Sequence, residues 1–114
     1  MGAVGLSEKD AKEAGYKVQI GKFPFSSSGA ARAMGDTQGF VKIVGDSETG
    51  EILGVHIIGE HATDLIGESV TAMTMEAAVE DLAETIKPHP TLSENVMEAA
   101  MAWSSMAIHS PKNK

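Results

Sequence analysis

A histidine held between two prolines is the first feature of this sequence that could do chemistry. In KPHPTLSENV (87–96), His89 lies between Pro88 and Pro90, and Glu94 follows five residues after the histidine. Each proline restricts the preceding residue to extended conformations, so the His89 ring is expected to project from a stiff segment. The Glu94 carboxylate could accept a hydrogen bond from one imidazole nitrogen and leave the other to pass a proton. The spacing therefore predicts an acid/base pair, although no nucleophile accompanies it.

The same residues also fit a purely structural interpretation. Thr91 and Glu94 have the spacing of a capping box, in which each side chain satisfies a backbone N–H at the start of a helix. Glu94 could then stabilise the helix that follows, while His89 lies in a surface turn. Spacing alone leaves both interpretations open.

Other candidate sites carry weaker signals. His56 and His61 could join His89 or His109 around a metal ion, but the sequence has no cysteine and no H-E-x-x-H spacing. We therefore expect no metal site, and we expect His56 to point from a strand into a polar contact. Neither G-x-G-x-x-G nor G-x-x-x-x-G-K-[ST] occurs, so no loop for nucleotide phosphates is visible.

The composition is that of one small globular domain, which we take to span residues 1–114. Hydrophobic residues make up 42% of the chain and charged residues 22%, values typical of soluble proteins. No apolar run approaches the ~20 residues of a membrane span, and the N-terminus lacks the pattern of a signal peptide. These features, with the absence of cysteine, predict a cytoplasmic protein that does not enter a membrane.

The charge narrows the choice of partners. The formal net charge is −7, and nine lysines and arginines are spread along the chain, so nucleic acid is not an expected partner. A basic protein partner is electrostatically reasonable. Four acidic residues of the second half of the chain could form either a solvated helix face or a docking surface: Glu76, Glu80, Asp81 and Glu84.

The first elements that must position His89 are a short helix and three strands. Ser7 and Asp10 resemble a capping box, which predicts a helix over residues 8–14 that stops at Gly15. Residues 16–25, YKVQIGKFPF, then alternate in the manner of a strand, with Val18 and Ile20 on one face, and Pro24 marks an edge position or the strand's end.

Two further β-rich runs, 39–45 and 51–59, flank a short loop and predict an antiparallel hairpin. Strict alternation in the second run would place three apolar side chains on one face: Leu53, Val55 and Ile57. Ile52 and Ile58 would then lie on the other face, which indicates a strand covered on both sides.

The second half of the chain changes to helical periodicity. Helices are predicted over about 62–76, 79–86 and 92–106, because apolar residues recur there at three- and four-residue spacing. The predicted inward face of the first of these carries Ala62, Leu65, Ile66, Ser69, Val70, Met73 and Ala77. The order of helix, strands and then helices predicts an α+β fold, with an antiparallel sheet and helices packed on one face.

The last helix has a second apolar row formed by Met97, Met101 and Ile108. Five of the seven methionines lie between Met73 and Met106. They could fill the core of the monomer, or they could form a surface that becomes buried when the chain oligomerises.

At HPTLSE the sequence resembles the C-terminal dimerisation, or interface, domain of the flavin-dependent pyridine nucleotide-disulfide oxidoreductases, most closely the dihydrolipoyl dehydrogenases. The resemblance runs in order through four other stretches: VGLSEKDAKEAG (4–15), FPFSSSGAARAMGDTQGFVKIV (23–44), ETGEILGVHIIG (48–59) and ATDLIGE (62–68).

This resemblance implies a homodimer whose subunits also contain an FAD domain and an NAD domain. His89 would work as acid/base in the partner subunit's active site, beside a flavin and a redox-active cysteine pair, and Glu94 would orient it. The His89–Pro90 peptide would be cis, with its backbone near the partner's FAD. FAD and NAD would belong to the full-length enzyme, and none is expected on this chain alone.

The resemblance also implies NAD-linked oxidation of dihydrolipoyl groups, and a lipoyl acyltransferase subunit of a 2-oxo acid dehydrogenase complex as a further partner. The chain departs from the family at Lys87, where a second histidine is frequent, and at Glu60 and His61. Two alternatives remain: a free-standing, non-enzymatic dimerisation or docking module, and the same domain from a related disulfide reductase.

Overall fold

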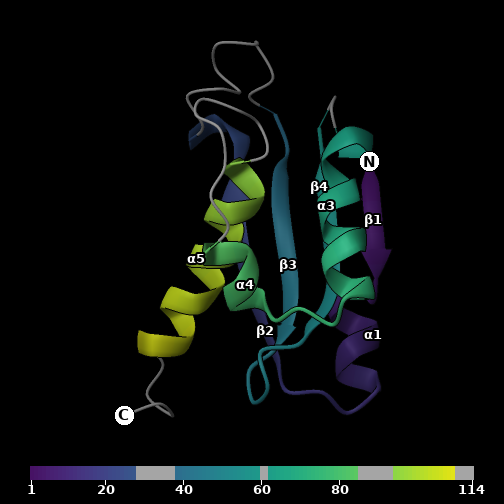
Figure 1. Cartoon of the computed structure of the whole chain (residues 1–114), viewed down its shortest axis with the longest axis vertical. Helices are drawn as coiled ribbons and strands as arrows, with labels where there is room; N and C mark the ends of the chain where they lie inside the picture. Colours follow the sequence, from purple (N-terminus) through teal and green to yellow (C-terminus); the bar gives the residue numbers. More distant parts are fainter. Residues whose placement is uncertain (28–37, 60–61, 85–93, 110–114) are drawn as a thin grey trace.

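A four-stranded antiparallel sheet forms the centre of the structure, a computed structural model that describes residues 1–27, 38–59, 62–84 and 94–109 (Figure 1). The strands are β1 (Gly2–Gly5), β2 (Val18–Pro24), β3 (Phe40–Asp46) and β4 (Ile52–Ile58). Their order across the sheet is β1-β4-β3-β2. The helices are α1 (Glu8–Glu13), the 3₁₀ turn η1 (Phe25–Ser27), α3 (Ala62–Thr74), α4 (Val79–Glu84) and α5 (Glu94–His109).

The larger helices cover one face of the sheet, and the predicted α+β class is confirmed. Helix α3 packs on β1 and β4, α5 packs on β2 and β3, and α4 packs against α5 (Figure 1). Helix α5 continues to His109, beyond the predicted end near Met106. Val70 does not lie on the buried side of α3, as its spacing predicted, because 42% of it is exposed. None of the helices in the described ranges is both long and apolar enough to cross a bilayer.

The predicted hairpin is confirmed as β3 and β4, and Pro24 both ends β2 and lies on an edge strand. The sequence patterns missed β1, which pairs antiparallel with β4 as the other edge. This strand has four residues, two of which are the glycines that bound it. Such a stretch shows neither alternation nor β-branched enrichment, so pairing with β4 is what makes it a strand.

A β-bulge in the hairpin is also invisible in the sequence. Strand β3 pairs Val44 with Gly54 but pairs Gly45 with Ile52. Leu53 is therefore an extra residue in β4, and it reverses the alternation of side chains on its N-terminal side.

The bulge corrects the predicted grouping of side chains on β4. Strict alternation placed Leu53 with Val55 and Ile57. In the structure Leu53 packs with Ala11 of α1, while Ile52 joins Val55 and Ile57 under the larger helices. Strand β4 is nevertheless covered on both faces where the bulge lies, as its apolar residues predicted.

Helix α1 lies on the opposite face of the sheet from α3 and α5, and its local signals act as predicted. The Ser7 hydroxyl accepts a hydrogen bond from the backbone N–H of Asp10 at 3.1 Å. The helix ends at Glu13 with Ala14 as its C-cap, and Gly15 follows with a φ of +95°, a left-handed conformation that favours glycine. Leu6 and Ala11 belong to the same apolar cluster, so the connection from β1 is fixed against the sheet.

Trp103 joins α5 to the sheet through two buried hydrogen bonds. Its indole Nε1–H donates to the backbone carbonyl of Gln19 at 2.7 Å. The Gln19 amide donates in return to the backbone carbonyl of Trp103, also at 2.7 Å. Both residues are buried, and the two hydrogen bonds satisfy the indole N–H and the side-chain amide N–H, which packing removes from water.

Two glycines under Trp103 let the helix approach the sheet closely. A Cβ atom at Gly21 would meet the backbone carbonyl oxygen of Ala99 and lie 2.5 Å from the Cβ atom of Trp103. A Cβ atom at Gly45 would lie 2.6 Å from the indole nitrogen. Because the obstacles at Gly21 are mainly helix backbone, a rotamer change cannot remove the clash.

We expect Gly21→Ala to lower the free energy of unfolding by about 3 kcal/mol, since overpacking would force α5 away from β2. Gly67→Ala is the matched control, because a Cβ atom at this exposed helical position meets nothing within 4 Å. The control should raise stability by about 0.5–1 kcal/mol. Chemical denaturation of the two variants checks both values, and equal stabilities would contradict the close approach of α5.

Candidate functional site

Glu94 is the first residue of α5, and it is the one predicted catalytic residue inside the described part of the chain. It is partly buried in the helix's first turn, where a carboxylate interacts favourably with the positive end of the helix dipole. His89 and Pro90, with Lys87, lie outside the described residues. The predicted contact between the His89 ring and the Glu94 carboxylate therefore remains a prediction.

The elements on either side of the histidine segment are held against each other. Helix α4 ends at Glu84, α5 begins at Glu94, and the two helices pack together. Val79 and Leu82 of α4 are buried in the same apolar cluster as the inward face of α5. That inward face consists of Val96, Ala99, Ala100 and Trp103. Both ends of the 85–93 connection are thus anchored to the core.

A buried amide beside Glu94 was not singled out by the sequence patterns. Asn95 is 1% exposed, and its Nδ2 has no hydrogen-bond partner within the described residues. Asparagine is ordinarily a surface residue. The sequence feature that could have indicated its burial is its position next to Val96, which belongs to the apolar stripe of α5. Burial of Asn95 and Val96 indicates that one side of the first turn of α5 faces the core, while Glu94 stays partly exposed.

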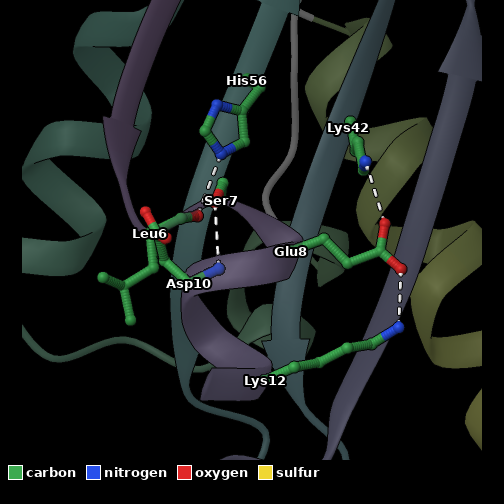
Figure 2. A network of polar contacts seen from close by, with 7 residues as sticks. All are labelled: Leu6, Ser7, Glu8, Asp10, Lys12, Lys42 and His56. Atoms are coloured by element: carbon green, nitrogen blue, oxygen red, sulfur yellow. Dashed lines mark hydrogen bonds and ion pairs between the residues drawn. The ribbon is translucent and has the colours of Figure 1, made fainter. Parts of the chain in front are cut away.

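A second polar cluster lies on the α1 side of the sheet, and Figure 2 shows its members. His56 of β4 points along the sheet to the end of β1, where its Nε2 lies 3.0 Å from the backbone carbonyl oxygen of Leu6. Because a carbonyl only accepts, Nε2 carries a proton in this contact. The predicted polar contact of His56 is confirmed, and it ties the start of α1 to β4.

The Glu8 carboxylate lies between two lysines in the same cluster (Figure 2). Its Oε2 is 3.1 Å from the Lys12 Nζ, and its Oε1 is 3.1 Å from the Lys42 Nζ. The hydrogen bond from Lys12, followed by that from Lys42, lowers the pKa of Glu8 from the ordinary value of 4.5. Glu8 thereby connects α1 to the middle of β3.

Among the described residues, no group of three or more histidines, cysteines or carboxylates lies close enough together to hold a metal ion. His61 is outside the described ranges, so its predicted grouping with His56 is not placed. Glu76, Glu80, Asp81 and Glu84 are all exposed, as expected for a solvated acidic face.

Most of this architecture matches a known protein family. A profile described as the pyridine nucleotide-disulphide oxidoreductase dimerisation domain matches residues 1–100. The chain belongs to this family. The match includes the sheet, α3, α4 and the first turns of α5 that contain Glu94.

Curated relatives narrow the similarity within the family. The chain is 54% identical over 106 residues to a dihydrolipoyl dehydrogenase of Thermus scotoductus, which covers 93% of this chain and 23% of that protein. It is 51% identical over 107 residues to the dihydrolipoyl dehydrogenase of Bacillus subtilis, covering 94% of this chain and 23% of that protein. The chain thus spans about a quarter of the length of these relatives.

Solved structures agree with the fold. LpdA of Mycobacterium tuberculosis superposes with a TM-score of 0.80 at 27% identity, covering 87% of this chain and 22% of that one. RclA of Escherichia coli, an HOCl-induced flavoprotein disulfide reductase solved as a Cu(II) complex, superposes with a TM-score of 0.82 at 27% identity. That match also covers 87% of this chain and 22% of the other.

The Glu8 cluster gives a testable pH dependence. A carboxyl whose folded pKa is lowered contributes stability above its unfolded pKa and loses it as the pH falls through the folded pKa. Because 38% of the Glu8 side chain is exposed, water screens the pairs, and we expect Glu8→Gln to cost about 0.2–1 kcal/mol at pH 7. The difference should disappear below the folded pKa of Glu8, in acid.

Denaturation of the wild type and the variant at neutral and acid pH measures this difference. Glu13→Gln, on the same helix and exposed, is the control and should show little effect at either pH. A Glu8→Gln penalty that is equal at both pH values would assign the effect to packing and not to charge.

Proposed function

We propose that this chain is the dimerisation domain of a longer flavin-dependent dihydrolipoyl dehydrogenase, and that it supplies His89 and Glu94 to the active site of the partner subunit. The observation that carries the proposal is the 54% identity to a dihydrolipoyl dehydrogenase over 93% of this chain. The motif HPTLSE and the position of Glu94 at the start of α5 support the same assignment.

In this proposal His89 moves protons while the redox chemistry occurs elsewhere. A dithiol substrate must lose protons as its sulfur attacks a disulfide, because the thiolate is the attacking species. An imidazole with a pKa near neutrality can accept such a proton and later return it. Glu94 would accept a hydrogen bond from the other ring nitrogen, fix the tautomer and stabilise the imidazolium. Anchoring of α4 and α5 would reduce the entropy lost in holding the ring in position.

The cysteine pair and both cofactors would belong to other parts of the polypeptide. This chain has no cysteine and neither of the glycine-rich nucleotide loops. When bound, FAD would take electrons from the dithiol and pass them to NAD. The contribution of this domain would be His89, Glu94 and the backbone at Pro90.

The helical side of the domain supports self-association. Met101 of α5 is 46% exposed, Val70 of α3 is 42% exposed, and Met75, just after α3, is 76% exposed. Large apolar groups left in water by one copy are covered when a symmetric second copy packs against them. We propose that the homodimer uses this side, which would carry the start of α5 toward the partner.

The upstream reading frame distinguishes this proposal from its alternatives. FAD and NAD fingerprints before Met1 would support an enzyme domain, whereas a native start at Met1 would favour a free-standing dimerisation or docking module. The similarity to RclA keeps a related disulfide reductase as the second candidate.

For the dehydrogenase, a lipoyl acyltransferase subunit with a basic docking surface would be the further partner, since Glu76, Glu80 and Glu84 are exposed.

In the full-length protein, His89→Gln should reduce the turnover number for dihydrolipoamide by roughly 100- to 10,000-fold, the usual contribution of a positioned acid/base. Glu94→Gln should reduce it less, because the imidazole remains, and should shift the pH profile. Glu98→Gln, one turn along α5, is the matched control and should leave turnover unchanged. Near-normal dihydrolipoamide oxidation by the His89→Gln protein would overturn the assignment.

Sedimentation equilibrium tests the proposed dimer surface. Met101→Glu should weaken self-association by about tenfold or more, since a charge would be buried at an apolar contact. Ile58→Glu is the control, because Ile58 is similarly exposed, at 42%, but lies on the other face of the sheet. An intact dimer with Met101→Glu and a dissociated one with Ile58→Glu would reverse the choice of face.

A further inference from the structure

Asn95 belongs to the row of α5 side chains that packs on β2. It precedes Ala99 by four residues and Trp103 by eight, so these three side chains share one side of the helix. That side lies very close to β2, because a Cβ atom at Gly21 would meet the Ala99 carbonyl oxygen and lie 2.5 Å from the Trp103 Cβ. Asn95 is 1% exposed, so a carboxamide is buried at the end of an otherwise apolar row.

The packing of the domain does not account for an amide at this position. Further along the same contact, the polar groups of Trp103 and Gln19 are paired with each other. The Asn95 Nδ2 has no acceptor among the residues that the structure describes. A buried donor without an acceptor lowers stability, and an apolar side chain of similar shape would avoid that cost. A residue that breaks a packing rule in this way calls for a functional explanation.

The first turn of α5 does not supply an acceptor for this amide. The first backbone N–H groups of a helix are themselves donors without a partner in the helix, whereas the carbonyl groups of that turn bond to N–H groups one turn later. Adjacent side chains on a helix do not face each other, so the Glu94 carboxylate is turned away from the Asn95 amide. The acceptor must therefore come from outside this turn.

The direction of the side chain indicates where that acceptor lies. Each Cα–Cβ bond of a helix tilts toward the N-terminus, and a side chain covers the turn that precedes its own Cα atom. Asn95 is the second residue of α5, so its amide is directed to the point where the chain enters the helix. The chain that enters there is the 85–93 connection, which carries His89 and whose backbone carbonyl groups are acceptors.

We propose that Asn95 is a positioning residue for the His89–Glu94 pair, and that its Nδ2 donates to a backbone carbonyl group of the connection that carries His89. The inference rests on the proposed function, because it presupposes that these two residues act as an acid/base pair. It goes further by adding a residue that holds the backbone of the histidine segment, while Glu94 holds the ring. Asn95 contacts no substrate in this arrangement and acts only through the position of His89.

Steady-state kinetics of the full-length protein with Asn95→Leu test the proposal. Leucine keeps the branched shape of asparagine but has no donor. The turnover number for dihydrolipoamide should fall about 10- to 100-fold, since a small displacement of an acid/base group has an effect of this size. KM should stay unchanged, because the interaction removed is not one with the substrate.

The pH profile separates positioning from a purely structural role. In the proposed site Glu94 stabilises the imidazolium form of His89, so a looser contact would let the ring lose its proton more easily. The acid limb of the kcat/KM profile should therefore move to lower pH in the Asn95→Leu protein. The thermal unfolding midpoint should be unchanged or higher, since an unpaired buried amide is removed. A lower midpoint with unchanged kcat and pH profile would overturn the proposal.

Two further variants control for bulk and for burial. Asn95→Ala removes the amide without adding volume and should reproduce both kinetic changes; normal kinetics in this variant would mean that bulk slowed the leucine protein, and the proposal would be wrong. Ser69→Ala is the matched control. Ser69 is fully buried and its Oγ also lacks a partner in the described ranges, but it lies on α3, which packs on β1 and β4. Kinetic losses in Ser69→Ala equal to those in Asn95→Ala would also refute a specific role.

Failure of this inference and failure of the proposed function give different results. If His89→Gln abolishes dihydrolipoamide oxidation while both Asn95 variants are normal, the positioning role is wrong and the enzyme assignment stands. If His89→Gln leaves the oxidation near normal, the proposed function fails, and the role of Asn95 fails with it.

Discussion

The close packing of α5 on the sheet is the constraint from which the rest of the domain follows. Gly21 and Gly45 leave no side chain where Trp103 and the helix backbone must pass. The two reciprocal hydrogen bonds between Trp103 and Gln19 then fix the position of α5 along β2. Both bonds can form together only at one rotation of the helix about its axis and one position along that axis. Helix α5 begins at Glu94, so the contact near its middle also fixes where that carboxylate lies. An acid that orients a histidine must be held within a fraction of an ångström, and a rigid helix provides this better than a loop does.

The sheet has two unlike sides, and this asymmetry organises the proposals about function. Under α3 and α5 it carries the main core, and the outer surfaces of these helices expose Met101 and Val70. On the α1 side the core is small, and beyond it the sheet exposes basic and apolar rows. The two sides therefore differ in chemistry: the helical side exposes apolar groups, whereas the α1 side also presents Lys22, Lys42 and His56.

Much of the fold could be predicted because its signals are local. Ser7 and Gly15 bound α1 through hydrogen bonds and backbone conformation that involve only neighbouring residues, and the β3–β4 hairpin is closed by a short loop. The errors were non-local. Strand β1 exists because β4 offers it an edge, and the bulge at Leu53 arises in the pairing of two strands. Val70 follows the spacing of a buried residue, but it is 42% exposed once α3 has packed on β1 and β4.

The sequence by itself determined the class of fold, the order of the elements from α1 onward and the identity of the candidate pair, since HPTLSE contains His89 and Glu94 whatever the packing around them. Tertiary structure alone decided that Glu94 is the first residue of a helix packed on the sheet, that Asn95 beside it is buried, and that Lys22 lies over the Phe40 ring. The physical reason is one of range. Caps, turns and periodicity act over a few residues and can be read along the chain, whereas register and burial depend on segments far apart in sequence that meet only when the core forms.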